Sequence, residues 1–213
     1  EEIKILQHHR GPVFDIQYSL KTNCFYTAGG DGNFAVCSLD TLSLRIMKKL
    51  SYDKARSIAF NEETSEIAVA LGDSNVLIFD LFTLEHKNDF IAHQVGEKVV
   101  GANVVRYSPD GKFLLTGGRD AHLNIWSVEN YELIKSIPAH NWAIYDIVFN
   151  PDATLFATAS RDKTIKIWDA KTYQVLKRIT KLNFEAHTHS VNKLIWSTFR
   201  NYLVSVGDDK IVM

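Results

Sequence analysis

A short pattern that recurs five times at nearly constant spacing is the strongest constraint on the fold of this chain. Each copy places an aspartate between a run of small residues and a β-branched or aromatic run, as in "TASRDKTIKIW". The marker residues are Asp31, Asp73, Asp120, Asp162 and Asp209, and successive copies lie 42, 47, 42 and 47 residues apart. Internal repeats of roughly 40–50 residues are typical of four-stranded propeller units. The sequence therefore predicts a repeat architecture.

The segments between these aspartates have the composition and the alternation that are typical of short strands and turns. Alternating runs such as "VFDIQYS", "LNIWSV" and "TIKIWDA" are rich in β-branched and aromatic residues. Turn-forming segments separate them, among them "GGDGN" and "SPDGK". No segment shows a long helical period, so the pattern predicts an all-β fold. Arranging such units radially would leave only short, protected sheet edges.

Composition limits the classes of protein to which the chain can belong. The 213 residues can bury a substantial core, and a net charge of −1 excludes a global field that recruits nucleic acid or an anionic membrane. No apolar run approaches the roughly 18 residues of a membrane helix. Cys24 and Cys37 form no CxxC pair, which excludes a disulfide scaffold and a cysteine zinc site. Two cysteines fit a reducing compartment, and we expect a cytoplasmic location.

The repeats resemble the WD-repeat β-propeller family over essentially the whole chain. The fourth unit matches best, because Ala139–His140 stands where the family has Gly-His and "IWD" at 167–169 supplies the Trp-Asp ending. The resemblance implies four-stranded antiparallel blades, with the last unit truncated. The expected units cover approximately residues 1–39, 40–80, 81–128, 129–170 and 171–213.

The resemblance also implies a polar tetrad of His, Ser or Thr, Asp and Trp within each blade. In the fourth unit these residues are His140, Thr158, Asp162 and Trp168. The equivalent residues elsewhere are His93, Thr116, Asp120 and Trp126; His9, Thr27 and Asp31, with Cys37 in place of tryptophan; and His187, Ser205 and Asp209. The second unit has Ser51, Val69, Asp73 and Phe79 and keeps only the aspartate, so we expect apolar packing to substitute there.

His, Thr and Asp are also the residue types of a hydrolytic triad, which makes catalysis an alternative to be weighed. A triad is needed once per active site, whereas this set recurs in four of the five units. Buried imidazole, hydroxyl, indole and carboxylate groups cost energy unless they are paired. A relay from Trp through Thr and His to Asp pairs all of them and fixes a loop to its hairpin. We therefore expect a structural role, no catalytic residue and no enzyme activity.

Five blades are represented, and we expect them to be part of a seven-bladed ring, the commonest form in the family. Residues 1–7, "EEIKILQ", are expected to form the outer strand of an earlier blade.

In this family the usual contact surface is the narrow face formed by the loops that lead into each blade. Matching the repeats predicts a partner-binding set there: Phe14, Arg56, Asn103, Arg119, Trp142, Tyr145, Arg161, Asn192 and Asp208. Aromatic residues with arginines are typical of binding hot spots. Arg119 and Arg161 come from adjacent blades and could together bind a carboxylate or phosphate. The alternative is that the aromatic residues pack between blades and the arginines are solvated.

Other candidate sites are weaker. His187 and His189 lie two apart, but His187 already belongs to a tetrad, so no metal site is expected. "GGDGN" leads into a strand and not a helix, so it reads as a turn and not as a phosphate cradle. Scattered lysines without an aromatic stacking series give no support for nucleic-acid binding. No cofactor and no membrane contact are expected.

The sequence thus predicts a non-catalytic scaffold that binds a protein or peptide partner on the face of the blade-leading loops. The alternative is a propeller enzyme or ligand sensor with a site at the central channel. That alternative would need acids converging from the innermost strands, which offer only Asp15 and Asp146.

Overall fold

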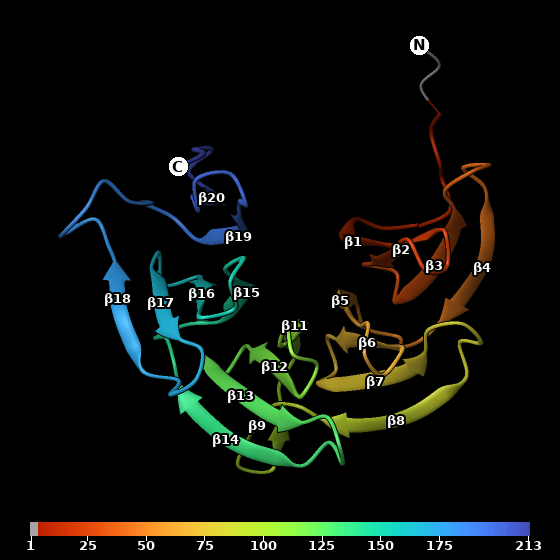
Figure 1. Cartoon of the computed structure of the whole chain (residues 1–213), viewed down its shortest axis with the longest axis horizontal. Coiled ribbons are helices and arrows are strands. Elements are labelled where there is room, and N and C mark those ends of the chain that lie inside the picture. Colours follow the sequence, from red (N-terminus) through yellow and green to blue (C-terminus); the bar gives the residue numbers. More distant parts are fainter. Residues whose placement is uncertain (1–3) are drawn as a thin grey trace. The chain divides into compact units, whose positions relative to one another are not determined.

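The computed structural model describes residues 4–213 and contains two compact units, residues 1–105 and 106–213. The described residues lie in β-strands, turns and irregular segments, which confirms the predicted all-β class. Four sheets have four strands each, and the strands of each sheet neighbour one another in sequence order (Figure 1). Each sheet is therefore an up-and-down run of antiparallel strands, as expected for a propeller blade.

The first unit holds two complete four-stranded sheets and a small hairpin. The first sheet comprises β1 (Val13–Ser19), β2 (Cys24–Gly29), β3 (Asn33–Ser38) and β4 (Leu44–Lys49). The second sheet comprises β5 (Ala55–Asn61), β6 (Glu66–Leu71), β7 (Asn75–Asp80) and β8 (His86–Ile91). The hairpin consists of β9 (Gln94–Val95) and β10 (Lys98–Val99), and it accommodates the extra residues that follow His93.

The second unit holds most of the third sheet, the fourth sheet and a two-stranded sheet. The third sheet comprises β11 (Ala102–Tyr107), whose sequence contains the division between the units, β12 (Phe113–Gly118), β13 (His122–Ser127) and β14 (Leu133–Pro138). The fourth comprises β15 (Ile144–Phe149), β16 (Leu155–Ser160), β17 (Ile165–Asp169) and β18 (Val175–Ile179). The last sheet comprises β19 (Val191–Trp196) and β20 (Leu203–Gly207), and Val212 forms an isolated bridge to Val206.

Four of the repeated aspartates lie in the turn between the second and third strands of a four-stranded sheet, and Asp209 lies in the equivalent turn after β20. In all five, Oδ1 accepts a hydrogen bond of 3.0–3.3 Å from the backbone N–H two residues later, which belongs to Asn33, Asn75, His122, Thr164 and Ile211. The residue between has a positive φ of 63–83°, and these residues are Gly32, Ser74, Ala121, Lys163 and Lys210. An aspartate that accepts from the backbone two residues on stabilises such a tight turn. The turn therefore explains why aspartate recurs in every unit.

Apolar side chains between neighbouring sheets form the core of each unit. In the first unit, Tyr26, Phe34, Ile58, Ile67 and Phe79 belong to one buried cluster. The rings of Phe34 and Phe79 stack with centroids 6.4 Å apart, so the cluster joins the first sheet to the second. Such packing is the main source of stability when each sheet cannot bury its faces alone.

The core of the second unit follows the same plan. Ala157, Ile165 and Leu194 belong to a buried cluster that spans the fourth sheet and β19. Trp196 packs partly buried against this cluster.

The predicted repeat units and the observed sheets are offset by one strand. Strand β4 falls in the unit predicted over 40–80, and β8 falls in the unit predicted over 81–128. One repeat of the sequence therefore supplies the fourth strand of one sheet and the first three strands of the next. Residues 4–7, expected to belong to an outer strand, lie in no strand, and residues 1–3 of that expectation lie outside the described residues. A strand needs a paired neighbour, and none of the described strands pairs with residues 4–7.

Candidate functional site

The fourth sheet brings His140, Thr158, Asp162 and Trp168 into one hydrogen-bonded chain. The Trp168 indole donates to Thr158 Oγ1 at 2.9 Å, and that oxygen lies 2.7 Å from His140 Nε2. His140 Nδ1 lies 3.0 Å from Asp162 Oδ2. The tetrad therefore links the loop before β15 to the β16–β17 hairpin. Every polar group in this buried chain has a partner.

The electrostatics of this tetrad keep its aspartate ionised. Burial alone would raise the pKa of Asp162, but hydrogen bonds from His140, Thr164 and the Asn141 N–H outweigh it and hold that pKa far below its usual range. Burial lowers the pKa of His140, against the opposing effect of Asp162. A neutral imidazole beside a charged carboxylate is the expected state at neutral pH.

The first sheet repeats this arrangement without a tryptophan. His9 Nδ1 lies 3.0 Å from Asp31 Oδ1, and His9 Nε2 lies 2.7 Å from Thr27 Oγ1. Cys37 fills the tryptophan position and is buried. His8 is half-buried, and its Nε2 lies 3.3 Å from Thr27 Oγ1. It contacts the hydroxyl that an indole contacts in the fourth sheet, and the doublet "HH" is the only signal for this in the sequence.

The last sheet holds a three-membered version. His187 Nδ1 lies 2.9 Å from Asp209 Oδ1, and His187 Nε2 lies 2.9 Å from Ser205 Oγ. Burial opposes ionisation of the Asp209 carboxyl, but hydrogen bonds from His187 and the backbone lower its pKa to about 2.

In the third sheet, the Trp126 indole donates to Thr116 Oγ1 at 3.0 Å, and both residues belong to the second unit. Asp120 stabilises its turn through the His122 N–H, whereas His93 belongs to the first unit.

The second sheet keeps one polar contact that the sequence did not predict. Ser51 occupies the histidine position, and its hydroxyl donates to Asp73 Oδ2 at 2.5 Å. Val69 and Phe79 are fully buried at the threonine and tryptophan positions. The serine hydroxyl can donate to the turn aspartate as the histidine does in the first, fourth and last sheets. The contact between loop and turn is therefore kept, although the threonine and tryptophan positions are apolar.

The tetrad histidines are unsuited to proton transfer with a substrate. The side chains of His9, His140 and His187 are 3%, 0% and 1% exposed. Both ring nitrogens of each already contact a carboxylate and a hydroxyl inside the sheet. A general base must reach the proton that it removes, and these imidazoles do not face solvent.

Asp15 and Asp146, the acids of the channel alternative, are both buried in seams between neighbouring sheets. Asp15 Oδ2 accepts from the Ile58 N–H on β5 at 2.9 Å. Asp146 Oδ2 accepts from the Leu194 N–H on β19, also at 2.9 Å. Each carboxylate therefore joins the first strand of one sheet to the first strand of the next. Sequence analysis did not predict this role, because neither acid is next in sequence to the strand that it contacts.

The predicted contact residues of the second unit are largely accessible. Trp142 is 59% exposed, and the Arg161 guanidinium lies over its ring, 5.4 Å from the centroid. Arg119 is exposed, Tyr145 is half-buried, and Asn192 donates from Nδ2 to Asp208 Oδ1 at 2.6 Å. The surface thus combines an exposed cation–π pair, a further arginine and a polar pair.

The loop that carries Trp142 is held in place by the neighbouring turn. Ser160 Oγ donates to the Trp142 carbonyl at 3.0 Å and accepts from the Asp162 N–H at 3.0 Å. The Arg161 N–H donates to the Ala143 carbonyl at 2.9 Å, and the Asn141 N–H donates to Asp162 Oδ2 at 3.0 Å. The tetrad aspartate and the exposed Trp–Arg pair therefore belong to one rigid arrangement.

The predicted contact residues of the first unit are less exposed. The Arg56 guanidinium lies over the Phe14 ring, 4.6 Å from the centroid, and both residues are half-buried. Asn103 is buried and presents almost no surface to a partner.

Over residues 4–213, no group of three or more His, Cys, Asp or Glu side chains is placed to hold a metal ion. Within the same range, the structure has no helix whose length and apolar character would let it cross a bilayer.

Comparison with known proteins agrees with this geometry. The sequence model described as "WD domain, G-beta repeat" matches residues 85–127, 131–169 and 178–213. The chain is 42% identical over 43 residues to the general transcriptional corepressor TUP1 of Saccharomyces cerevisiae, covering 20% of this chain and 6% of that protein. It is 23% identical over 146 residues to WD repeat-containing protein 90 of Xenopus tropicalis, covering 65% of this chain and 8% of that protein.

The chain thus spans less than a tenth of the length of each of these relatives. The matched repeats cover more than half of its residues. Like the repeats predicted from the sequence, they begin one strand before the first strand of a sheet. Repeated tetrads, four-stranded sheets and the family match agree, and the chain belongs to the WD-repeat family.

Proposed function

We propose that this chain is a non-catalytic scaffold that binds a protein or peptide partner through the loops leading into its blades. The observation that carries the proposal is the exposed Trp142–Arg161 pair on a loop fixed by Ser160 and Asp162. Tryptophan and arginine are the residue types most enriched in binding hot spots. A surface that is already ordered loses little entropy on binding.

The contact surface in this proposal is made chiefly by the second unit. Its residues are Arg119, Trp142, Tyr145, Arg161, Asn192 and Asp208, and Phe14 with Arg56 would form a smaller contact on the first unit. WD-repeat domains generally act in protein–protein interactions, and the similarity to a transcriptional corepressor supports a regulatory partner. The two unpaired, buried cysteines support a reducing, cytoplasmic setting.

The experiment that tests this function is affinity selection from a random peptide library displayed on phage. Peptides selected on the 213-residue chain should lose about tenfold or more in affinity with Trp142→Ala or with Arg119→Glu/Arg161→Glu. Lys171→Glu, at an exposed turn between β17 and β18, is the matched control and should leave affinity unchanged. Selected peptides that bind all variants equally would place the contact elsewhere and overturn the proposal.

A further inference from the structure

We propose that a pocket between the fourth sheet and the loop leading to β19 binds the phosphate group of a phosphorylated partner polypeptide. The pocket shares no residue with the contact surface above, so this inference does not depend on that surface. The charge and the volume of the pocket define the class of ligand that it can bind.

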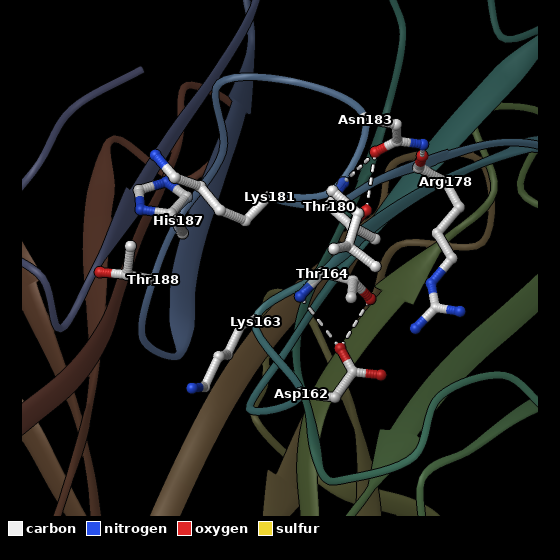
Figure 2. Close-up of a pocket in the computed structure, with 10 residues that line it drawn as sticks. Asp162, Lys163, Thr164, Arg178, Thr180, Lys181, Asn183, His187 and Thr188 are labelled. Carbon is white, nitrogen blue, oxygen red and sulfur yellow. Dashed lines mark hydrogen bonds between the residues drawn. The ribbon is translucent and has the colours of Figure 1, made fainter.

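The pocket has a volume of about 590 Å³, within the usual range for ligand sites. The β16–β17 turn forms one side, and the β18–β19 loop forms the other (Figure 2). The lining residues are Asp162, Lys163, Thr164, Arg178, Thr180, Lys181, Leu182, Asn183, His187 and Thr188. All of them belong to the second unit, so the site is complete within one compact body.

Three cations line this pocket against a single carboxylate. Among the described residues, no ion pair involves Lys163, Arg178 or Lys181. The one carboxylate of the pocket, Asp162, already accepts hydrogen bonds from His140, Thr164 and the Asn141 N–H. An anion entering here would therefore gain charge–charge attraction without displacing an existing partner.

The charge of the surrounding segment is unusual for this chain. Residues 161–181 contain seven Lys or Arg and only two Asp, whereas the whole chain has a net charge of −1. Burial and, after it, the nearby Arg178 guanidinium lower the pKa of Lys166, whereas the Asp162 carboxylate opposes them. The pocket lining itself has more positive than negative charge, since Lys163, Arg178 and Lys181 face the single carboxylate of Asp162. A phosphomonoester, with close to two negative charges, would balance this excess.

Side-chain hydrogen bonds close the turn that follows β18. Asn183 Oδ1 accepts from the Thr180 N–H at 2.9 Å and from the Thr180 hydroxyl at 2.7 Å, as Figure 2 shows. Asn183 Nδ2 donates to the Arg178 carbonyl at 3.0 Å, so Arg178 and Lys181 flank a closed turn. Lys163 is fixed on the opposite side by its turn conformation, with φ 71°. Binding would thus order side chains only, which lowers its entropic cost.

The neighbourhood favours a polypeptide over a nucleic acid. None of the ten lining residues is Phe, Tyr or Trp, and the side chain of the one imidazole, His187, is only 1% exposed, so the pocket offers no platform on which bases could stack. A second cavity of about 190 Å³ shares Lys163 and His187 with it and has Ile165, Ile167, Ile179 and Leu203 in its wall. Leu182, at the tip of the loop, is 99% exposed. Apolar surface beside a phosphate site suits a chain in which a phosphorylated residue and an apolar residue are neighbours.

The test uses two immobilised peptide libraries that differ only in a central phosphothreonine or threonine. The 213-residue chain should prefer the phosphorylated library, and Arg178→Gln/Lys181→Gln should weaken that binding about tenfold or more. Lys112→Gln/Lys171→Gln removes the same charge from exposed lysines outside the pocket and should change binding less than about twofold. Trp142→Ala should preserve the phosphate preference, because that residue lies outside the pocket. An unchanged far-UV circular dichroism spectrum would show that each variant is folded.

Four results would overturn the inference. Equal binding of the two libraries would exclude phosphate recognition. Equal loss in the pocket and control variants would show general charge attraction and no site. Loss of the phosphate preference in Trp142→Ala would move the phosphate to the contact surface of the proposed function. Preferential binding to vesicles that contain a phosphoinositide would assign the pocket to a lipid headgroup.

Discussion

The second and fourth sheets fill the same tetrad positions with different residue types, apolar in the second sheet and polar in the fourth. In the fourth sheet, His140, Thr158 and Trp168 fill three positions with polar groups that satisfy one another. In the second, Val69 and Phe79 fill two of those positions with apolar groups, and Phe79 stacks instead on the first sheet. Both sheets keep the aspartate, because Asp73 and Asp162 each cap the same left-handed turn. The turn requires its aspartate, whereas the relay can be exchanged as a set.

The comparison can be tested separately in the two units. All four tryptophans lie in the second unit, so their fluorescence reports its unfolding. Both cysteines are buried in the first unit, so the rate of thiol labelling reports its opening.

Replacing Thr158 should have the largest effect. Thr158→Val removes the partner of both His140 Nε2 and the Trp168 indole, leaving two buried groups unsatisfied. We expect the free energy of unfolding to fall by about 2–4 kcal/mol. Urea denaturation followed by tryptophan fluorescence measures it. A loss no greater than about 0.5 kcal/mol would show that the relay adds nothing over apolar packing.

The two aspartates should differ when each is truncated. Asp162→Ala should cost about 1–3 kcal/mol, because His140 and the turn both lose their acceptor. Asp73→Ala should cost less, about 1 kcal/mol, since only Ser51 and the turn depend on it. Tryptophan fluorescence measures the loss of stability in Asp162→Ala, and thiol labelling measures it in Asp73→Ala. Equal losses would contradict the idea that the relay adds to the turn.

Introducing polarity into the second sheet should be unfavourable. Val69→Thr places a hydroxyl opposite Leu77 at a fully buried position without the histidine and tryptophan that would pair with it. We expect a loss of about 1–2 kcal/mol, detected as faster labelling of Cys24 and Cys37. If the variant is as stable as the parent chain, then single members of the relay are exchangeable.

Acid should affect the fourth sheet gradually. The pKa of Asp162 lies below its unfolded value of about 3.9, so its stabilising effect is complete above that pH and is lost as pH falls towards the folded pKa. The contribution of this one group cannot exceed about 1.4 kcal/mol per pH unit. Denaturation midpoints of the parent chain between pH 6 and pH 3 should therefore fall more steeply than those of Asp162→Asn. Parallel curves would rule out this source of acid sensitivity.

The sequence predicted the all-β class, the four-stranded units and the family because each depends on residues that repeat. A period of 42 or 47 residues is visible in one sequence, and the turn aspartate that marks it has a local cause. The grouping of His140, Thr158, Asp162 and Trp168 required the family pattern, since these residues are far apart along the chain.

Features that depend on contacts between repeats were not predictable in this way. Ser57 illustrates the limit: its hydroxyl accepts from the Val105 N–H at 3.3 Å, 48 residues away. No sequence pattern in either segment predicts this contact, and none predicts the hydrogen bond from the Ile58 N–H to Asp15. The pocket around Arg178 was equally invisible, because it is made by a turn and a loop whose lysines look scattered in sequence.

The carboxylates of Asp15 and Asp146 determine how far the destabilising effect of a change in one sheet reaches along the chain. Asp15 ties the first sheet to the second, and Asp146 contacts β19 of the following sheet and Arg106 of the preceding one, so communication along the array passes from neighbour to neighbour. A chain of this kind can therefore change one module, as the second sheet has done, while distant modules retain their own folding energetics.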